Sequence, residues 1–113
     1  MNPRRGELYW VRFDPALGSE AAQTRPALVV SSDPNNKAMP TLSVVPLTSS
    51  LKRLYPFEVF LEATESGLPK DSKIQTQQIR TVSHERLDKL IGQVGEQTMI
   101  LVGEALKLHL ALT

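Results

Sequence analysis

The 113-residue sequence contains no cysteine, which excludes a disulfide framework and a metal site built from thiolates. It also lacks a strong charge of either sign: the formal net charge is +1, so a surface that binds nucleic acid over its whole extent is not expected. There is no long apolar run, and the first apolar segment, residues 8–13, is too short and too mixed for a signal peptide or a membrane span. These absences predict a cytoplasmic protein without a membrane contact, in which local basic pairs such as Lys52-Arg53 would make any phosphate contacts.

Three widespread catalytic or phosphate-binding motifs are also absent. The chain has no glycine-rich phosphate loop, no His-Glu-x-x-His zinc motif and no Gly-x-Ser-x-Gly nucleophile elbow. Its two histidines, His84 and His109, lie at the start and the end of the region expected to be helical, as a solvated first-turn residue and a residue near the terminus. An acid–base mechanism that depends on two histidines is therefore not expected, and neither a metal nor a cofactor is predicted.

Segments typical of β-strands come first in the chain, and helical patterns come last. The expected strands are residues 6–13, 27–32, 41–47, 57–62 and 73–82. Turn-forming residues separate them, notably Asp-Pro-Asn-Asn at 33–36. Ser83 is expected to cap a short helix that runs to residue 91, and residues 96–112 are expected to form a longer helix with two apolar stripes. This order favours a mostly β fold with C-terminal helices (α+β), a small antiparallel barrel or sheet, in one domain of residues 1–113.

The stretch Gly-Ser-Glu-Ala-Ala-Gln-Thr-Arg-Pro at residues 18–26 comes directly before an apolar run expected to be a central strand. Pro26 disfavours the helical backbone for Arg25 and holds it extended at the entrance of that strand. If this strand and the next one form a hairpin, the sequence numbers of any two opposite residues add up to about 73. This rule places Thr48 opposite Arg25. The loop that carries Glu20 ends at the same edge, so we expect the three side chains to converge.

This convergence has a chemical and a structural interpretation. Cleavage of RNA by its own 2′-hydroxyl needs a base for the 2′ proton, donors that stabilise the charged phosphate oxygens, and a proton for the leaving 5′ oxygen. Glu20 can act as the base, the planar guanidinium of Arg25 matches phosphate oxygens, and Thr48 offers a hydroxyl donor. Alternatively, Glu20 and Arg25 form a surface ion pair of small energetic value, and Thr48 simply ends a strand.

Several motifs are also shared with a known family. In chain order they are Arg5-Gly6-Glu7-Leu8-Tyr9-Trp10, Phe13-Asp14-Pro15, Gly18-Ser19-Glu20, Arg25-Pro26-Ala27-Leu28-Val29-Val30, Pro46-Leu47-Thr48, Tyr55-Pro56-Phe57-Glu58-Val59 and Gln78-Ile79-Arg80-Thr81-Val82. From Arg5 to the C-terminus, the chain resembles the MazF/PemK family of toxin endoribonucleases (mRNA interferases), and it resembles the MazF branch more than the PemK branch.

The resemblance implies a fold, an activity and a set of partners. The fold would be an SH3-like, CcdB/PemK-like β-barrel with a C-terminal helix, assembled as a homodimer. The activity would be metal-independent cleavage of single-stranded mRNA at short sequences, which stops translation and growth. A cognate MazE-like antitoxin with a disordered acidic segment would inhibit it.

The resemblance also assigns roles to individual residues. Arg25 and Thr48 match the catalytic positions of the family, and Glu20 matches a proposed acid–base group. Where the PemK-like branch has an aspartate, this chain has Gln77, which removes one acid–base candidate. The residues that resemble positions near the RNA groove, or that would hold flanking phosphates, are Ser19, Lys52, Arg53, Gln77, Gln78 and Arg80.

Two other functions remain open on the sequence alone. A CcdB-like toxin shares the barrel and acts by binding gyrase through its C-terminal tail, but the tail here, Leu-Ala-Leu-Thr at 110–113, lacks the Trp-Gly-Ile ending of that group. An RNA-binding dimer that has lost cleavage is the third alternative, because Gln77 replaces a candidate acid–base residue.

Overall fold

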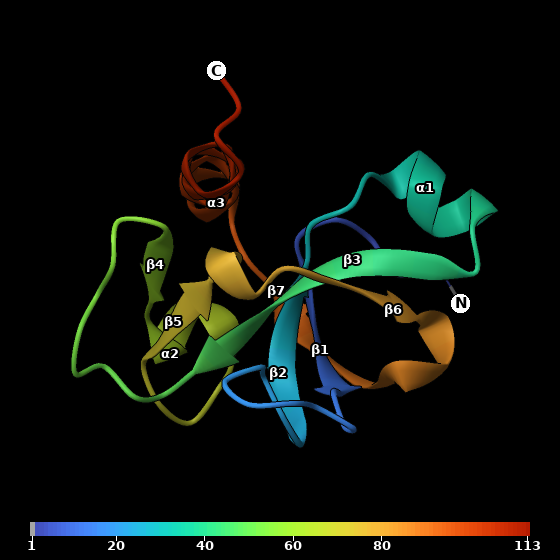
Figure 1. Cartoon of the computed structure of the whole chain (residues 1–113), viewed down its shortest axis with the longest axis horizontal. Coiled ribbons are helices and arrows are strands. Elements are labelled where there is room, and N and C mark those ends of the chain that lie inside the picture. Colours follow the sequence, from blue (N-terminus) through green and yellow to red (C-terminus); the bar gives the residue numbers. More distant parts are fainter. Residues whose placement is uncertain (1) are drawn as a thin grey trace.

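The computed structural model describes residues 2–113, in which seven strands are interspersed with short helical elements and followed by one longer helix (Figure 1). The strands are β1 (Glu7–Arg12), β2 (Thr24–Val29), β3 (Thr41–Thr48), β4 (Glu58–Leu61), β5 (Ser72–Gln75), β6 (Arg80–Ser83) and β7 (Leu87–Gln93). The helical elements are α1 (Asp33–Ala38), α2 (Ala63–Ser66), the 3₁₀ turns η1 (Thr76–Gln78) and η2 (His84–Arg86), and α3 (Glu96–Leu110).

All strand pairs are antiparallel, and the main path through the sheet is β4-β5-β3-β2-β1-β7. The long strand β3 crosses the molecule, and it pairs with β6 along its first half and with β5 at its end (Figure 1). Within residues 2–113 no pairing joins β4 to β7, so the sheet is open. The expected class, a mostly β fold with a C-terminal helix, is confirmed, although strand pairing does not close it into a barrel.

The register between β2 and β3 is the one that the hairpin geometry predicted. Ala27 pairs with Pro46, Leu28 with Val45 and Val29 with Val44, and in each pair the residue numbers sum to 73.

The connection between these strands, however, contains α1 where a turn at residues 33–36 was expected. Ser32 caps this helix by accepting the Asn35 N–H at 3.3 Å, and Pro34 lies in its first turn. Asp, Pro and Asn after a serine are signals for a helix start as well as for a turn, and here they start a helix.

The prediction of one strand over residues 73–82 is wrong, because η1 divides that segment into β5 and β6. The β3–β5 pairs, such as Leu47 with Ile74, have numbers that sum to 121, and the β3–β6 pairs, such as Val44 with Arg80, sum to 124. The two pairings with β3 are therefore offset by three residues. The three residues of η1 take up this offset as a single turn.

The prediction of a helix from Ser83 to residue 91 is also wrong. Ser83 does cap a helical turn, because its Oγ accepts the Glu85 N–H at 3.3 Å, but the turn is only η2 and the chain continues as β7. β7 pairs with β1 through two register shifts, between Leu8 and Tyr9 and between Tyr9 and Val11. Such irregularities disrupt the two-residue alternation of a strand, so the apolar spacing of β7 resembles that of a helix.

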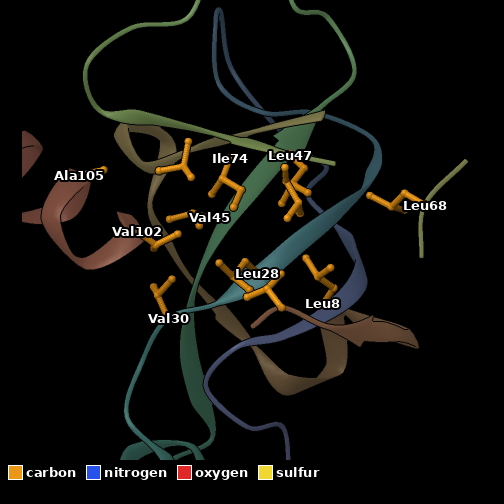
Figure 2. Close-up of a cluster of buried hydrophobic side chains, with 12 residues drawn as sticks. Leu8, Leu28, Val30, Val45, Leu47, Leu68, Ile74, Val102 and Ala105 are labelled. Atoms are coloured by element: carbon orange, nitrogen blue, oxygen red, sulfur yellow. The ribbon is translucent and has the colours of Figure 1, made fainter. Parts of the chain in front are cut away.

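Apolar side chains form core clusters on both faces of the central strands. One cluster includes Leu8 of β1 and Leu28 of β2, and α3 adds Val102 and Ala105 to it (Figure 2). The other cluster contains residues that alternate with the first, such as Val29 of β2. The expectation of a central strand buried on both faces is thus confirmed for β2.

The helix α3 matches the expected C-terminal helix, but much of its apolar surface is uncovered. Its buried residues are Thr98, Val102 and Ala105. Its exposed large apolar residues are Ile100, Leu101, Leu108 and Leu110, and Leu112 follows them in the chain. The second apolar stripe predicted for this helix consists of Leu101, Ala105, Leu108 and Leu112, and it faces outward apart from Ala105.

Candidate active site

Arg25 and Thr48 lie at the same end of the sheet, on neighbouring strands. Arg25 is in β2, where it pairs with Val11 of β1, and Thr48 is the last residue of β3, where it pairs with Lys73 of β5. The β2–β3 register, continued by two residues past its last pair, brings Arg25 opposite Thr48. Because directly opposite residues of antiparallel strands point to the same face, these two side chains share one face of the sheet.

Both side chains are half-buried and keep unused hydrogen-bonding groups. The Nε of Arg25 donates to the Ala22 carbonyl at 3.1 Å, and no other bond of this guanidinium is present among residues 2–113. The Oγ1 of Thr48 accepts the Ser50 N–H at 3.2 Å, which leaves its own proton free to be donated. The terminal nitrogens of Arg25 and the hydroxyl of Thr48 are therefore available to a ligand.

Glu20 lies in the loop between β1 and β2 and is exposed. Its Oε2 accepts the Leu17 N–H at 3.0 Å, and its own N–H donates to the Leu17 carbonyl at 3.1 Å. No ion pair joins it to Arg25 within the described part of the chain, so the interpretation of these two residues as a surface ion pair is not supported. The second carboxylate oxygen of Glu20 is available to a ligand.

A hollow of about 390 Å³ lies beside Glu20 and brings part of the predicted RNA-binding set together. Gln77, Gln78 and Arg80 line this hollow with Glu20. Arg80 donates to the Phe13 carbonyl at 2.8 Å, and its guanidinium lies 5.8 Å from the centre of the Phe13 ring. One wall of the hollow is thus held against the start of the Glu20 loop.

The two glutamines of this hollow are already bonded to protein groups. Gln78 binds the Glu20 loop: its Nε2 donates to the Ser19 carbonyl at 3.0 Å, and its Oε1 accepts the Ala21 N–H at 3.1 Å. Gln77 Nε2 donates to Glu58 Oε2 at 2.6 Å, and Gln77 Oε1 is buried with no hydrogen-bond partner among residues 2–113. Gln77 therefore keeps one acceptor that is unpaired but buried.

The other predicted contacts lie outside this hollow. Lys52 and Arg53 are exposed in the loop between β3 and β4, and the Arg53 guanidinium lies 5.1 Å from the centre of the Tyr55 ring. Ser19 is exposed, and its carbonyl accepts the bond from Gln78. The structure does not bring Lys52 or Arg53 to the residues that line the hollow.

A buried ion pair beside the site was not identified from the sequence. Lys73 Nζ lies 2.9 Å from Glu58 Oε1, with both side chains almost fully buried, and Lys73 also donates to the Arg53 carbonyl. Burial raises the pKa of Glu58, but hydrogen bonds from the Tyr55 N–H, Gln77 and Lys73 outweigh it and hold the pKa below the ordinary value. Glu58 is thus a carboxylate at neutral pH and cannot serve as a general acid.

The described part of the chain contains neither a candidate metal site nor a candidate membrane-spanning helix. Residues 2–113 contain no group of three or more His, Cys, Asp or Glu side chains placed to hold a metal ion. None of the helices formed by these residues has both the length and the apolar character needed to cross a membrane.

Comparisons with known proteins agree with this architecture. A solved structure of MazF from Deinococcus radiodurans (Form-I) superposes with a TM-score of 0.86 at 28% identity and covers 99% of each chain. A MazE–MazF structure from the same organism (Form-III) gives a TM-score of 0.81 at 27% identity and covers 100% of each chain. Endoribonuclease MazF9 of Mycobacterium tuberculosis is 48% identical over 114 residues, which cover 96% of this chain and 97% of that protein. The family model described as PemK-like, MazF-like toxin of type II toxin–antitoxin system matches residues 4–110, so the chain belongs to that family.

Proposed function

We propose that this protein is the toxin of a type II toxin–antitoxin system and an endoribonuclease that cleaves single-stranded mRNA in the cytoplasm. Membership of the toxin family and 48% identity to a protein named endoribonuclease MazF9 support this function over the gyrase-binding alternative. The observation that supports the proposal is the β2–β3 register, whose continuation by two residues sets Arg25 opposite Thr48, with the terminal nitrogens of Arg25 and the hydroxyl proton of Thr48 not donated to any group among residues 2–113. This placement provides donors for phosphate oxygens.

In the proposed reaction, the 2′-oxygen of one nucleotide forms a bond to the adjacent phosphorus, and the bond from phosphorus to the 5′-oxygen breaks. Glu20 accepts the 2′ proton through its free carboxylate oxygen, and water returns a proton to the leaving 5′-oxygen. The guanidinium of Arg25 and the hydroxyl of Thr48 donate to the phosphate oxygens as negative charge develops on them. The products would be a 2′,3′-cyclic phosphate and a 5′-hydroxyl, and no metal takes part.

The substrate would be held by groups around this centre. The hollow lined by Gln77 and Arg80 lies beside Glu20 and would take up a nucleotide next to it. Lys52 and Arg53 would hold phosphates farther along the strand, with Ser19 near the centre. Single-stranded RNA suits such a site because its bases are unstacked and present their edges.

We further propose that the protein is a homodimer that uses the uncovered face of α3. Leu101 and Leu108 of this helix line an apolar groove with Leu54 and Phe60, and all four side chains are exposed. Large apolar patches that remain exposed on a small protein mark interaction surfaces. A cognate antitoxin with an acidic segment that folds on binding would block the RNA site, as a member of a toxin–antitoxin family requires.

Incubation of the purified protein with a mixed RNA in the presence of EDTA tests the proposed function. Mapped fragment ends that carry 5′-hydroxyl groups are expected for the wild type, and Arg25→Ala should abolish them. Arg4→Ala is the matched control, because Arg4 is exposed and its side chain contacts none of the site residues.

Binding without cleavage would support the RNA-binding dimer that has lost its activity. Cleavage by the Arg25→Ala protein at the wild-type rate would contradict the mechanism. Absence of both binding and cleavage would contradict the proposed function.

A further inference from the structure

The loop between β1 and β2, which carries Glu20, is firmly held at its two ends. The Phe13 N–H donates to the Gln23 carbonyl at 2.9 Å, and the Gln23 N–H donates to Asp14 Oδ1 at 2.9 Å. Arg80 donates to the Phe13 carbonyl at 2.8 Å, and Arg86 donates to the Asp14 carbonyl at 2.6 Å. Side chains from the segment after β5 therefore fix the entrance of this loop, and the bonds of Gln23 to Phe13 and Asp14 hold the exit against that entrance.

The middle of the loop depends on a single side chain. The amide of Gln78 bonds to the backbone on both sides of Glu20, through the Ser19 carbonyl and the Ala21 N–H. In the described chain, no other hydrogen bond joins residues 19–21 to a residue outside the loop. Ala21 also packs in the second core cluster, so the loop has one apolar anchor beside these two bonds.

The element that carries Gln78 is itself rigidly placed. Gln78 is the last residue of η1, and its neighbour Gln77 bonds to the buried carboxylate of Glu58 at 2.6 Å. Thr76, at the start of η1, is buried and donates its hydroxyl proton to the Phe57 carbonyl. Adjacent glutamines thus connect the Glu20 loop to a fixed and buried part of the sheet.

We propose that Gln78 is a positioning residue that holds the backbone of Glu20 in the place that proton transfer requires. The inference rests on the proposed function of Glu20 as the base. It replaces the role of RNA contact predicted for Gln78 from the sequence. A base must lie within hydrogen-bond reach of the 2′-hydroxyl, so a loop that shifts by about 1 Å lowers the rate steeply.

The chemistry of the amide separates positioning from RNA contact. An amide has two donor hydrogens and two acceptor lone pairs, and Gln78 uses one donor and one acceptor on the loop. Keeping both loop bonds fixes the plane of the amide. Turning the amide out of this plane would break both bonds, so any contact with RNA that keeps the loop in place is limited to the second N–H and the second lone pair.

The decisive measurement compares Gln78→Ala with the wild type on an RNA oligonucleotide that the wild type cleaves. Positioning predicts that kcat falls about 10- to 100-fold. It also predicts an unchanged Kd for the same oligonucleotide with a 2′-deoxy nucleotide at the cleavage position, since that probe binds but lacks the nucleophile. Gln93→Ala is the matched control, because Gln93 is exposed in β7 outside the loop and the hollow. A raised Kd with an unchanged kcat would overturn the inference.

A double-variant cycle tests whether Gln78 acts through Glu20. If it does, Gln78→Ala has no further effect on kcat in a Glu20→Gln background. Additive effects, or a Glu20→Gln protein with the wild-type rate, would overturn the inference. The conservative variant Gln78→Glu keeps the acceptor for the Ala21 N–H and loses the donor to Ser19, so its kcat should lie between those of the wild type and Gln78→Ala.

Hydrogen exchange at the Ala21 amide distinguishes failure of this inference from failure of the proposed function. Gln78→Ala should speed that exchange while the amides of β2 and β3 remain protected. This result does not require any RNA cleavage. If the wild type cleaves no RNA but the exchange changes as expected, the proposed function fails and the loop contact stands; unchanged exchange overturns the inference even in an active enzyme.

Discussion

The protein has two polar clusters near the end of β3, and they differ in what their groups are bonded to. In the buried cluster of Glu58, Lys73 and Gln77, the carboxylate has several protein donors. In the half-buried cluster of Arg25 and Thr48, most donor capacity is unused. The comparison teaches that the buried charges fix the backbone, while the half-buried groups are left free to bind a substrate.

The largest effect is expected when the buried cluster is broken. Lys73→Met leaves the Glu58 carboxylate buried without its cation, which should lower the free energy of unfolding by about 3–5 kcal/mol. Urea denaturation measures this loss. The control is Lys70→Met, an exposed lysine nearby, for which a change within about 0.5 kcal/mol is expected. Equal effects of the two substitutions would show that the buried pair does not organise this region.

In the half-buried cluster, Arg25→Ala should lower kcat about 100- to 1000-fold, since it removes the principal donors to the phosphate oxygens. Arg25→Lys should recover only part of this loss, because an ammonium is a point charge and cannot donate in the planar fork of a guanidinium. Unfolding in urea should be nearly unchanged for both variants. Full activity of the lysine variant would mean that charge alone is needed.

A smaller effect is expected for the hydroxyl of Thr48. Thr48→Val keeps the side-chain shape and removes the donor, which should lower kcat about 10- to 100-fold, the value of one hydrogen bond to a charged group. Thr48→Ser retains the hydroxyl and should keep most of the activity. Single-turnover cleavage of an RNA oligonucleotide measures both. Equal rates for the valine and serine variants would exclude a role for the hydroxyl.

The smallest effect concerns the pH dependence of stability. The pKa of Glu58 is lower in the folded protein than its ordinary value of 4.5. Its ionised form therefore stabilises the fold above that value, and this contribution is lost as the pH falls through the lower, folded-state pKa. Urea midpoints measured from pH 7 down to about pH 3 should decrease more in the wild type than in Glu58→Gln. Parallel decreases would contradict the coupling.

The sequence predicted the central part of the fold correctly, and the catalytic roles of Arg25 and Thr48 remain predictions. The apolar run of β2 and the alternation in β1 determine which faces are buried, and the β2–β3 register follows from the residue numbers alone. That register brings Arg25 opposite Thr48 even though the connection contains α1 in place of a turn. Local patterns were sufficient here because the centre of the connection between the two apolar runs determines the sum of the paired residue numbers.

The rest depended on contacts between distant segments. The two register shifts in β7 obscured its strand pattern, and η1 is explained only by the two pairings of β3. The buried pair of Glu58 and Lys73 was missed because it requires the β4–β5 register, in which Glu58 faces Gln75 and Lys73 is two residues away on the same face. Knowledge of that register would have revealed it.

The three-residue length of η1 has a consequence for how the chain tolerates change. β5 and β6 each have a register with β3 that is set by pairing, so the number of residues between them is fixed by the sheet. Loss or gain of one residue there would turn every side chain of one strand to the opposite face. Insertions should thus be tolerated in the exposed loop that contains Lys52 and Arg53. They should not be tolerated in η1, because the pairings of β5 and β6 with β3 fix the number of residues between these two strands.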